Sequence, residues 1–199
     1  MREDAAAQPP AKWKLPGKAL IGICLFVFGI TMTEGAIADW SAVFLRDVFG
    51  AEPATAGIGY SVFAGMVAAG RFVGDWLKAR LGAVATARLC SCFSLIGMAL
   101  IVLAPISWLA FAGFAAAGFG VSVGFPLAVT AAAGLTDRPT AASVAILSFI
   151  ALFGFLIGPP MIGLVAEHLG LRYGLATLLP FLIVSLALTT MLVGSDRRT

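Results

Sequence analysis

Residues Leu89 to Thr136 form a stretch of 48 residues that contains no Asp, Glu, Lys or Arg. A helix needs about 20 mainly apolar residues to cross a membrane, so this stretch is too long for one crossing. Pro105 and the neighbouring Ser107 divide it, because proline breaks a helix and restricts the residue before it. The stretch therefore predicts two consecutive membrane-spanning helices.

The composition extends this prediction to the whole chain. Hydrophobic residues make up 60% of the 199 residues and charged residues 12%, against about 45–50% and about 25% in soluble domains. The mean hydropathy is +1.01. A soluble globule of this length still faces water over most of its surface. We therefore predict an all-α integral membrane protein in a lipid bilayer and, with a net charge of only +3, no nucleic-acid partner.

Six segments are long and apolar enough to span a membrane. They run over about residues 19–45, 54–76, 83–104, 107–134, 140–166 and 171–193. The sequence thus predicts a six-helix transmembrane domain over residues 19–193, between a polar tail over residues 1–18 and a short tail over residues 194–199. The start of the chain lacks the form of a cleavable signal peptide, because its first apolar run begins only at Ala19.

Lysine and arginine predict the orientation, because they concentrate on the cytoplasmic side of membrane proteins. With six spans both ends lie on one side. If the N-terminus is inside, 11 of the 13 Lys and Arg residues fall on inner segments, and only Arg46 and Arg172 fall outside. The sequence predicts that both termini are cytoplasmic, most simply in a bacterial plasma (inner) membrane.

Residues 70–82, between the second and third predicted spans, combine four charges with three glycines in what we expect to be a short loop. Arg71 and Asp75 are one helical turn apart and could pair. One reading is that these are interfacial charges that only fix the topology. The members of the motif are Gly70, Arg71, Gly74, Asp75, Lys78, Arg80 and Gly82.

This motif resembles the loop that recurs in each half of major facilitator superfamily transporters. The common pattern has glycine where this chain has Arg71 and Lys78, and Gly82 comes about one turn later. The register is similar to that of a branch such as the fucose permeases. Residues 154–170, with a Gly-Pro pair and a short acidic exit, resemble the penultimate helix of these transporters. Residues 118–126 resemble the kinked fourth helix of their C-terminal half.

The resemblance implies a fold and a function. The fold is the C-terminal six-helix half of a twelve-helix transporter, a 3+3 repeat, with residues 1–18 as a tail or the remnant of a central linker. The implied function is movement of a small solute by alternating access, coupled to protons. A missing N-terminal half, a second copy or a partner subunit would supply the other wall of the site. The alternative is a truncated, transport-incompetent membrane protein or an interaction scaffold.

The resemblance also implies a role for Asp75. It would latch onto the positive N-terminus of a helix in the facing half, where a carboxylate is favourable. In a second copy of this chain, that contact would lie around Thr140.

Two acidic residues interrupt the first span. Glu34 would lie about 22 Å into a core about 30 Å thick, off-centre toward the outside. An ionisable group in a span is a functional hypothesis by default, as a substrate or proton site. The open alternative is that the helix ends near Thr33, with Gly35 marking the end and Glu34 solvated. The candidates for the solute or proton pathway are Glu34, Asp39, Thr31, Thr33, Trp40 and Phe125.

The sequence offers little for an enzyme. It contains no nucleophile elbow, phosphate-cradling glycine loop or metal-ligand spacing. The one histidine, His168, excludes a site built from several histidines, and Ser143 and Ser148 do not share a helix face. We therefore predict no catalytic residues, no metal and no cofactor.

Overall fold

The computed structural model describes residues 16–198 of the chain. Within this range, six helical segments are long and apolar enough to cross a membrane, as predicted. The elements are α1 (Lys18–Phe49), α2 (Pro53–Leu81), α3 (Ala83–Leu103), α4 (Ser107–Val121), α5 (Gly124–Ala133), α6 (Thr140–Leu169), α7 (Leu171–Ala176), α8 (Leu179–Ala187) and the 3₁₀ segment η1 (Leu188–Arg198).

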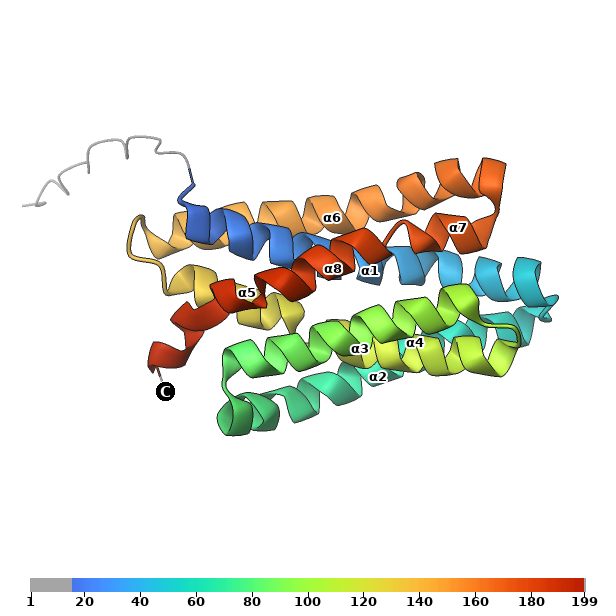
Figure 1. The fold of residues 1–199 in the computed structure, drawn as a ribbon, viewed down its shortest axis with the longest axis horizontal. Helices are drawn as coiled ribbons and strands as arrows, with labels where there is room; N and C mark the ends of the chain where they lie inside the picture. Colours follow the sequence, from blue (N-terminus) through green and yellow to red (C-terminus); the bar gives the residue numbers. More distant parts are fainter. Residues whose placement is uncertain (1–15, 199) are drawn as a thin grey trace, which may run out of the picture.

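The helices form an elongated bundle. The start of α1 and the end of η1 lie at the same end of its long axis (Figure 1). We call the end that holds Lys18, Gly82 and Arg198 the proximal end, and the opposite end the distal end. The distal end holds the connections after α1, α3 and α6. Glycines with positive φ end three of the helices, Gly50 at 65°, Gly82 at 79° and Gly170 at 89°, a conformation that side chains with a Cβ rarely adopt.

Two of the six spans are broken by proline. The fourth span stops at Ser122–Val123 and resumes as α5, because Pro126 cannot donate a hydrogen bond to the Ser122 carbonyl and its ring crowds that carbonyl. In the sixth span α7 ends at Ala176, four residues before Pro180, for the same reason. The kink that the sequence predicts in the fourth span is therefore present. In contrast, α6 continues through Pro159 and Pro160.

The core is centred on α1. The most apolar stretch of α1 is 78% buried, whereas those of α2, α6 and the last span, Leu171–Val193, are only 28% buried. Phe26 and Phe44 of α1 are fully buried with Phe114 of α4, and the Phe44 and Phe114 rings meet edge to face at 6.5 Å. The helices α2 and α6 and the last span therefore lie on the outside of the bundle, and most of their surface is left uncovered.

Glycines set the closest helix contacts. On α3, a Cβ at Gly97 would strike the backbone nitrogen of Ala117, and on α4 a Cβ at Gly113 would lie 2.8 Å from the Gly97 carbonyl oxygen. On α6, Gly154 and Gly158 both face backbone carbonyls of α1. Small residues allow this approach in membranes, where helix association depends on packing. The seams α3–α4 and α1–α6 thus hold the bundle together.

Candidate functional site

Glu34 lies at the midpoint of α1, as residue 17 of 32. The helix α1 continues for 15 residues beyond Glu34, further than the sequence predicts, so Glu34 is central within the helix. The alternative that the helix ends near Thr33, with Gly35 marking its end, is wrong, because Gly35 lies inside α1. It sits where α1 meets α6, with its Cα facing the Phe155 carbonyl, a carbonyl that lost its helical partner because residue 159 is proline.

Glu34 faces Arg71 of α2. Their closest charged atoms, Glu34 Oε1 and Arg71 Nη2, are 3.9 Å apart. The Glu34 side chain is 30% exposed and that of Arg71 is 61% exposed. The pair thus links the middle of α1, the most buried helix, to α2. It lies on a surface that the rest of this chain does not cover. The sequence suggested a pair of Arg71 with Asp75 instead, because contacts one turn apart are the ones that a sequence reveals.

The broken fourth span supports both helices of the pair. Gly70 and Gly74 of α2, which bracket Arg71, pack against the Ser122 and Val123 side chains. Gly124 packs against Ile30, one turn before Glu34. The break between α4 and α5 therefore fixes the spacing of α1 and α2 beside the charged pair. Phe125, the predicted pathway aromatic, follows this break directly and is 37% exposed.

The structure does not place the other polar candidates of α1 with Glu34. Thr33 is fully buried, and its hydroxyl donates to the Gly29 carbonyl at 2.9 Å. Thr31 is nearly buried, faces Gly154 of α6, and donates to the Val27 carbonyl at 3.1 Å. Successive helix positions point about 100° apart and α1 is covered on most sides, so Thr31 and Thr33 do not line one cavity with Glu34.

Asp39 and Trp40 face a different groove, between α1 and α6. Trp40 Nε1 donates to the Pro159 carbonyl at 3.1 Å. The groove has a volume of about 360 Å³, and Asp39, Pro160 and Gly163 also line it. Trp40 therefore joins the two helices just beyond the proline pair. Asp39 lies at this groove and does not share the Glu34 surface.

The motif of residues 70–82 was predicted to be a loop, but it is almost entirely helical. Residues 70–81 form the last turns of α2, and only Gly82 lies in the connection. Helix propensity explains the difference, because Leu, Lys, Ala and Arg continue a helix into water as well as in lipid. Asp75 is exposed, and the Arg80 guanidinium stacks over the Trp76 ring at 5.4 Å. Lys78 and Arg80 thus mark the proximal end of α2.

A second charged contact closes the distal end. Arg172 Nη1 and Nη2 donate to the carbonyls of Val102 and Ala104 at 2.7 and 2.6 Å. Its guanidinium also lies 5.8 and 5.4 Å from the ring centroids of Phe44 and Phe49. We call these contacts the Arg172 clamp. The sequence predicts Arg172 only as a charge on an outer segment, so the clamp was not predicted.

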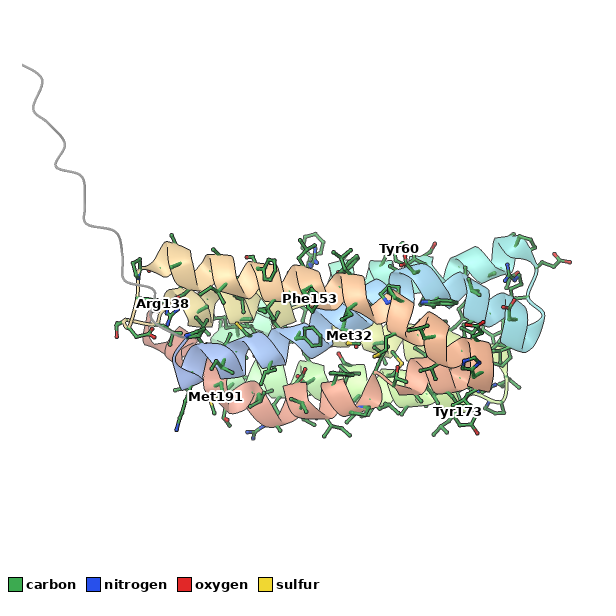
Figure 2. All side chains as sticks on the ribbon, turned by 90° about the horizontal axis from the view of Figure 1, so that it is seen from above. Met32, Tyr60, Arg138, Phe153, Tyr173 and Met191 are labelled. Carbon is green, nitrogen blue, oxygen red and sulfur yellow. The ribbon has the colours of Figure 1, made fainter. Side chains whose placement is uncertain are left out.

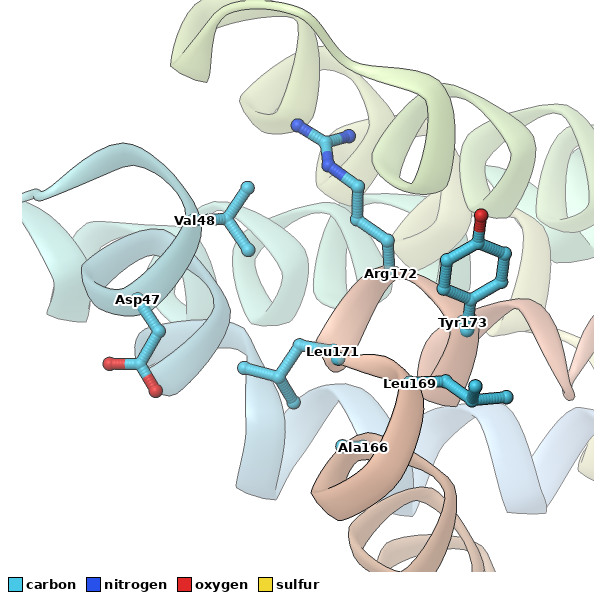
Figure 3. A pocket seen from close by; sticks show the side chains of 8 residues that line it. Asp47, Val48, Ala166, Leu169, Leu171, Arg172 and Tyr173 are labelled. Atoms are coloured by element: carbon cyan, nitrogen blue, oxygen red, sulfur yellow. The ribbon is translucent and has the colours of Figure 1, made fainter.

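Arg172 borders the pocket shown in Figure 3, at the distal ends of α1 and α6. The pocket has a volume of about 420 Å³ and is also lined by Asp47 and Tyr173. Both charged residues at this pocket already have partners. Arg172 extends from α7 toward α3 and donates to the Val102 carbonyl, and Asp47 Oδ1 lies 2.6 Å from Arg46 Nε. Among residues 16–198, no three His, Cys, Asp or Glu side chains gather to hold a metal ion.

Comparisons with known proteins agree with this architecture. The family model of the Major Facilitator Superfamily matches residues 8–199. An uncharacterized MFS-type transporter of Yersinia pestis is 37% identical over 161 residues, which cover 80% of this chain and 41% of that protein. The membrane protein MosC of Rhizobium meliloti is 32% identical over 152 residues, which cover 74% and 37%. The chain thus spans about two fifths of the length of these relatives.

A solved structure shows the same fold. The crystal structure of a bacterial homolog of the human lysosomal transporter Spinster, inward-facing and unoccupied, superposes with a TM-score of 0.64 at 17% identity. The superposition covers 98% of this chain and 54% of that chain. The family of this chain is one of transporters rather than enzymes. The chain is an integral membrane protein that belongs to the Major Facilitator Superfamily, and its six helices form one half of that transporter fold.

Proposed function

We propose that this chain is one half of a secondary transporter that moves a small solute by alternating access and couples it to protons. The observation that carries the proposal is the Glu34–Arg71 pair, half-open to solvent at the middle of α1. Ionisable groups inside a span are costly unless they face a water-filled cavity or the bundle interior. Substrate sites in such folds lie near the membrane midplane, between two repeats. The central position of Glu34 in α1 and its partial exposure support such a site.

Neutralising Glu34 tests this proposal. In everted membrane vesicles with an acidified lumen, a transported solute should release protons with the native chain, and Glu34→Gln should lower that release at least tenfold at unchanged expression. Glu52→Gln is the matched control, because Glu52 is an exposed carboxylate at the start of α2. Unchanged proton release with Glu34→Gln would remove Glu34 from the mechanism. If a broad solute panel moves no protons in either direction, with the chain alone or together with its facing half, the scaffold alternative holds.

We further propose that a second six-helix half covers α2 and α6, two long helices whose most apolar stretches are only 28% buried. Figure 2 places Tyr60 of α2 and Phe153 of α6 in one half of the bundle, with Tyr173 and Met191 at the opposite edge. The missing half could come from the same polypeptide, a second copy or a partner subunit. An immunoblot of native membranes against residues 194–199 distinguishes the first case, because a band near 20.5 kDa means a separate half and one about twice as large means a continuous transporter.

Asp75 should act as a latch in this cycle, with both termini on the cytoplasmic side of a bacterial inner membrane. A carboxylate near a helix N-terminus gains roughly 0.3–2 kcal/mol. We therefore expect Asp75→Asn to change the transport rate several-fold without lowering solute affinity. Glu167→Gln, at the far end of α6, is the control and should leave the rate unchanged. Equal rates for Asp75→Asn and the native chain would exclude the latch.

A further inference from the structure

Arg71 differs from other arginines of this chain in how its donors are used. Arg172 is held by two carbonyls and two aromatic rings. Arg46 Nε lies 2.6 Å from Asp47 Oδ1. Within the described residues, the contact of the Arg71 guanidinium is the 3.9 Å approach to Glu34, which is beyond hydrogen-bond length. A guanidinium offers five N–H donors in a fixed fork, so Arg71 presents a largely unfilled set of donors.

The location of Arg71 makes this unfilled fork unusual. It lies ten residues before the end of α2, inside a predicted span and next to the midpoint of α1. A 61% exposed arginine here is costly against lipid, so its exposed side should face the aqueous pathway. Its side chain approaches Glu34 of α1, and the flanking Gly70 and Gly74 fix the α2 backbone against the fourth span. The backbone that carries Arg71 is thus held in place beside Glu34.

We propose that Arg71 binds a carboxylate group of the transported solute, and that this carboxylate replaces Glu34 as the partner of the guanidinium. This inference rests on the proposed transport function. Guanidinium and carboxylate match in planar, bidentate geometry, which a partner at 3.9 Å does not achieve. Glu34 is the less exposed member of the pair. When no solute is bound, its carboxylate takes the place of the solute carboxylate beside Arg71. Arg71 therefore belongs to the solute site rather than to the latch.

Few other charged residues lie near the pair, so Glu34 and Arg71 determine the charge of the site. The helices α4, α5 and α8 contain no charged residue. In α6, Glu167 and His168 lie in the last turn, and Arg172 of α7 lies at the same distal end. Asp75, one turn after Arg71, is the nearest acid in the α2 sequence. With Glu34 and Arg71 of opposite sign, one added carboxylate and one proton on Glu34 would keep the site neutral.

Arginine-selective chemistry can test the site with simple carboxylates as probes, whatever the natural solute is. Phenylglyoxal should modify Arg71 in native membranes, and peptide mass spectrometry can follow its rate beside that of Arg80, the internal control. Butanoate, benzoate and succinate should each slow modification of Arg71 at least threefold and leave Arg80 unaffected. Butanamide and butylamine, which match butanoate in size, should protect neither residue. Glu34→Gln should strengthen protection by butanoate about tenfold, because it removes the competing carboxylate.

The outcomes separate this inference from the transport proposal. If no carboxylate protects Arg71, or if butylamine protects it equally well, the inference is overturned even if the chain transports a solute. If carboxylates protect Arg71 but no solute moves protons in vesicles, the binding site stands and the transport proposal fails. Arg71→Lys should retain part of the solute-dependent proton release and Arg71→Gln none. Equal transport by both variants would also contradict the inference.

Discussion

Replacing Gly97 with leucine should destabilise the bundle by about 3 kcal/mol, because overpacking a tight core forces backbones apart. A Cβ at this position would already strike the Ala117 nitrogen and lie 2.7 Å from the Gly113 carbonyl oxygen. These atoms belong to the backbone of α4 and cannot move aside as a flexible side chain can. We therefore expect α3 and α4 to separate along their whole seam.

The measurement is unfolding of the purified chain in mixed micelles of mild detergent and SDS, followed by far-UV circular dichroism. Gly65→Leu is the matched control, because Gly65 is also a helical glycine and an added Cβ would meet nothing within 4 Å. It should change the unfolding midpoint by less than a quarter as much. Equal effects of the two substitutions would show that helix propensity, rather than the α3–α4 contact, limits stability.

Arg172→Met should have the second largest effect, a loss of about 3 kcal/mol, because hydrogen bonds to charged groups contribute about 1.5–3 kcal/mol each and buried carbonyls would lose their donors. The substitution keeps a long side chain near Phe44 and Phe49 but removes the donors to Val102 and Ala104. The loss should therefore come from the end of α3 rather than from the core.

Two variants separate the clamp from simple charge. Arg46→Met removes the same charge from the same end of the bundle. The Arg46 side chain is 61% exposed and pairs with its sequence neighbour Asp47, so this substitution should shift the thermal midpoint little. Arg172→Lys should recover less than half of the loss, because an ammonium cannot reach two carbonyls with a planar fork. Full recovery by lysine would mean that charge alone stabilises the distal end.

The spans could be predicted from the sequence because hydropathy is a local property. The 48-residue uncharged stretch and Pro105 define two spans whatever their neighbours are. Hydropathy reports the surrounding solvent, however, and does not report where a helix ends. This is why α1 and α2 continue for several residues past the predicted limits, to Phe49 and Leu81.

The site was less predictable because its contacts join distant parts of the chain. Glu34 stood out as an acid in an apolar run, but its partner Arg71 lies 37 residues later on another helix. Thr31 and Thr33 were expected beside Glu34 because they are close in sequence, and the helix turns them toward other neighbours. The role of Arg172 depends on the ends of α3 and α1, which no spacing rule connects.

The central position of α1 has a consequence for biosynthesis. Roughly ninety residues separate the end of α1 from the start of α6, the helix whose glycines close over it. At about 5–20 residues per second, the ribosome needs roughly 5–20 s to make them. During that interval Glu34 and its neighbours lie in the nascent chain without the α6 surface that later covers α1. Of the six spans described, α1 is thus the earliest to be made and among the last to complete its packing.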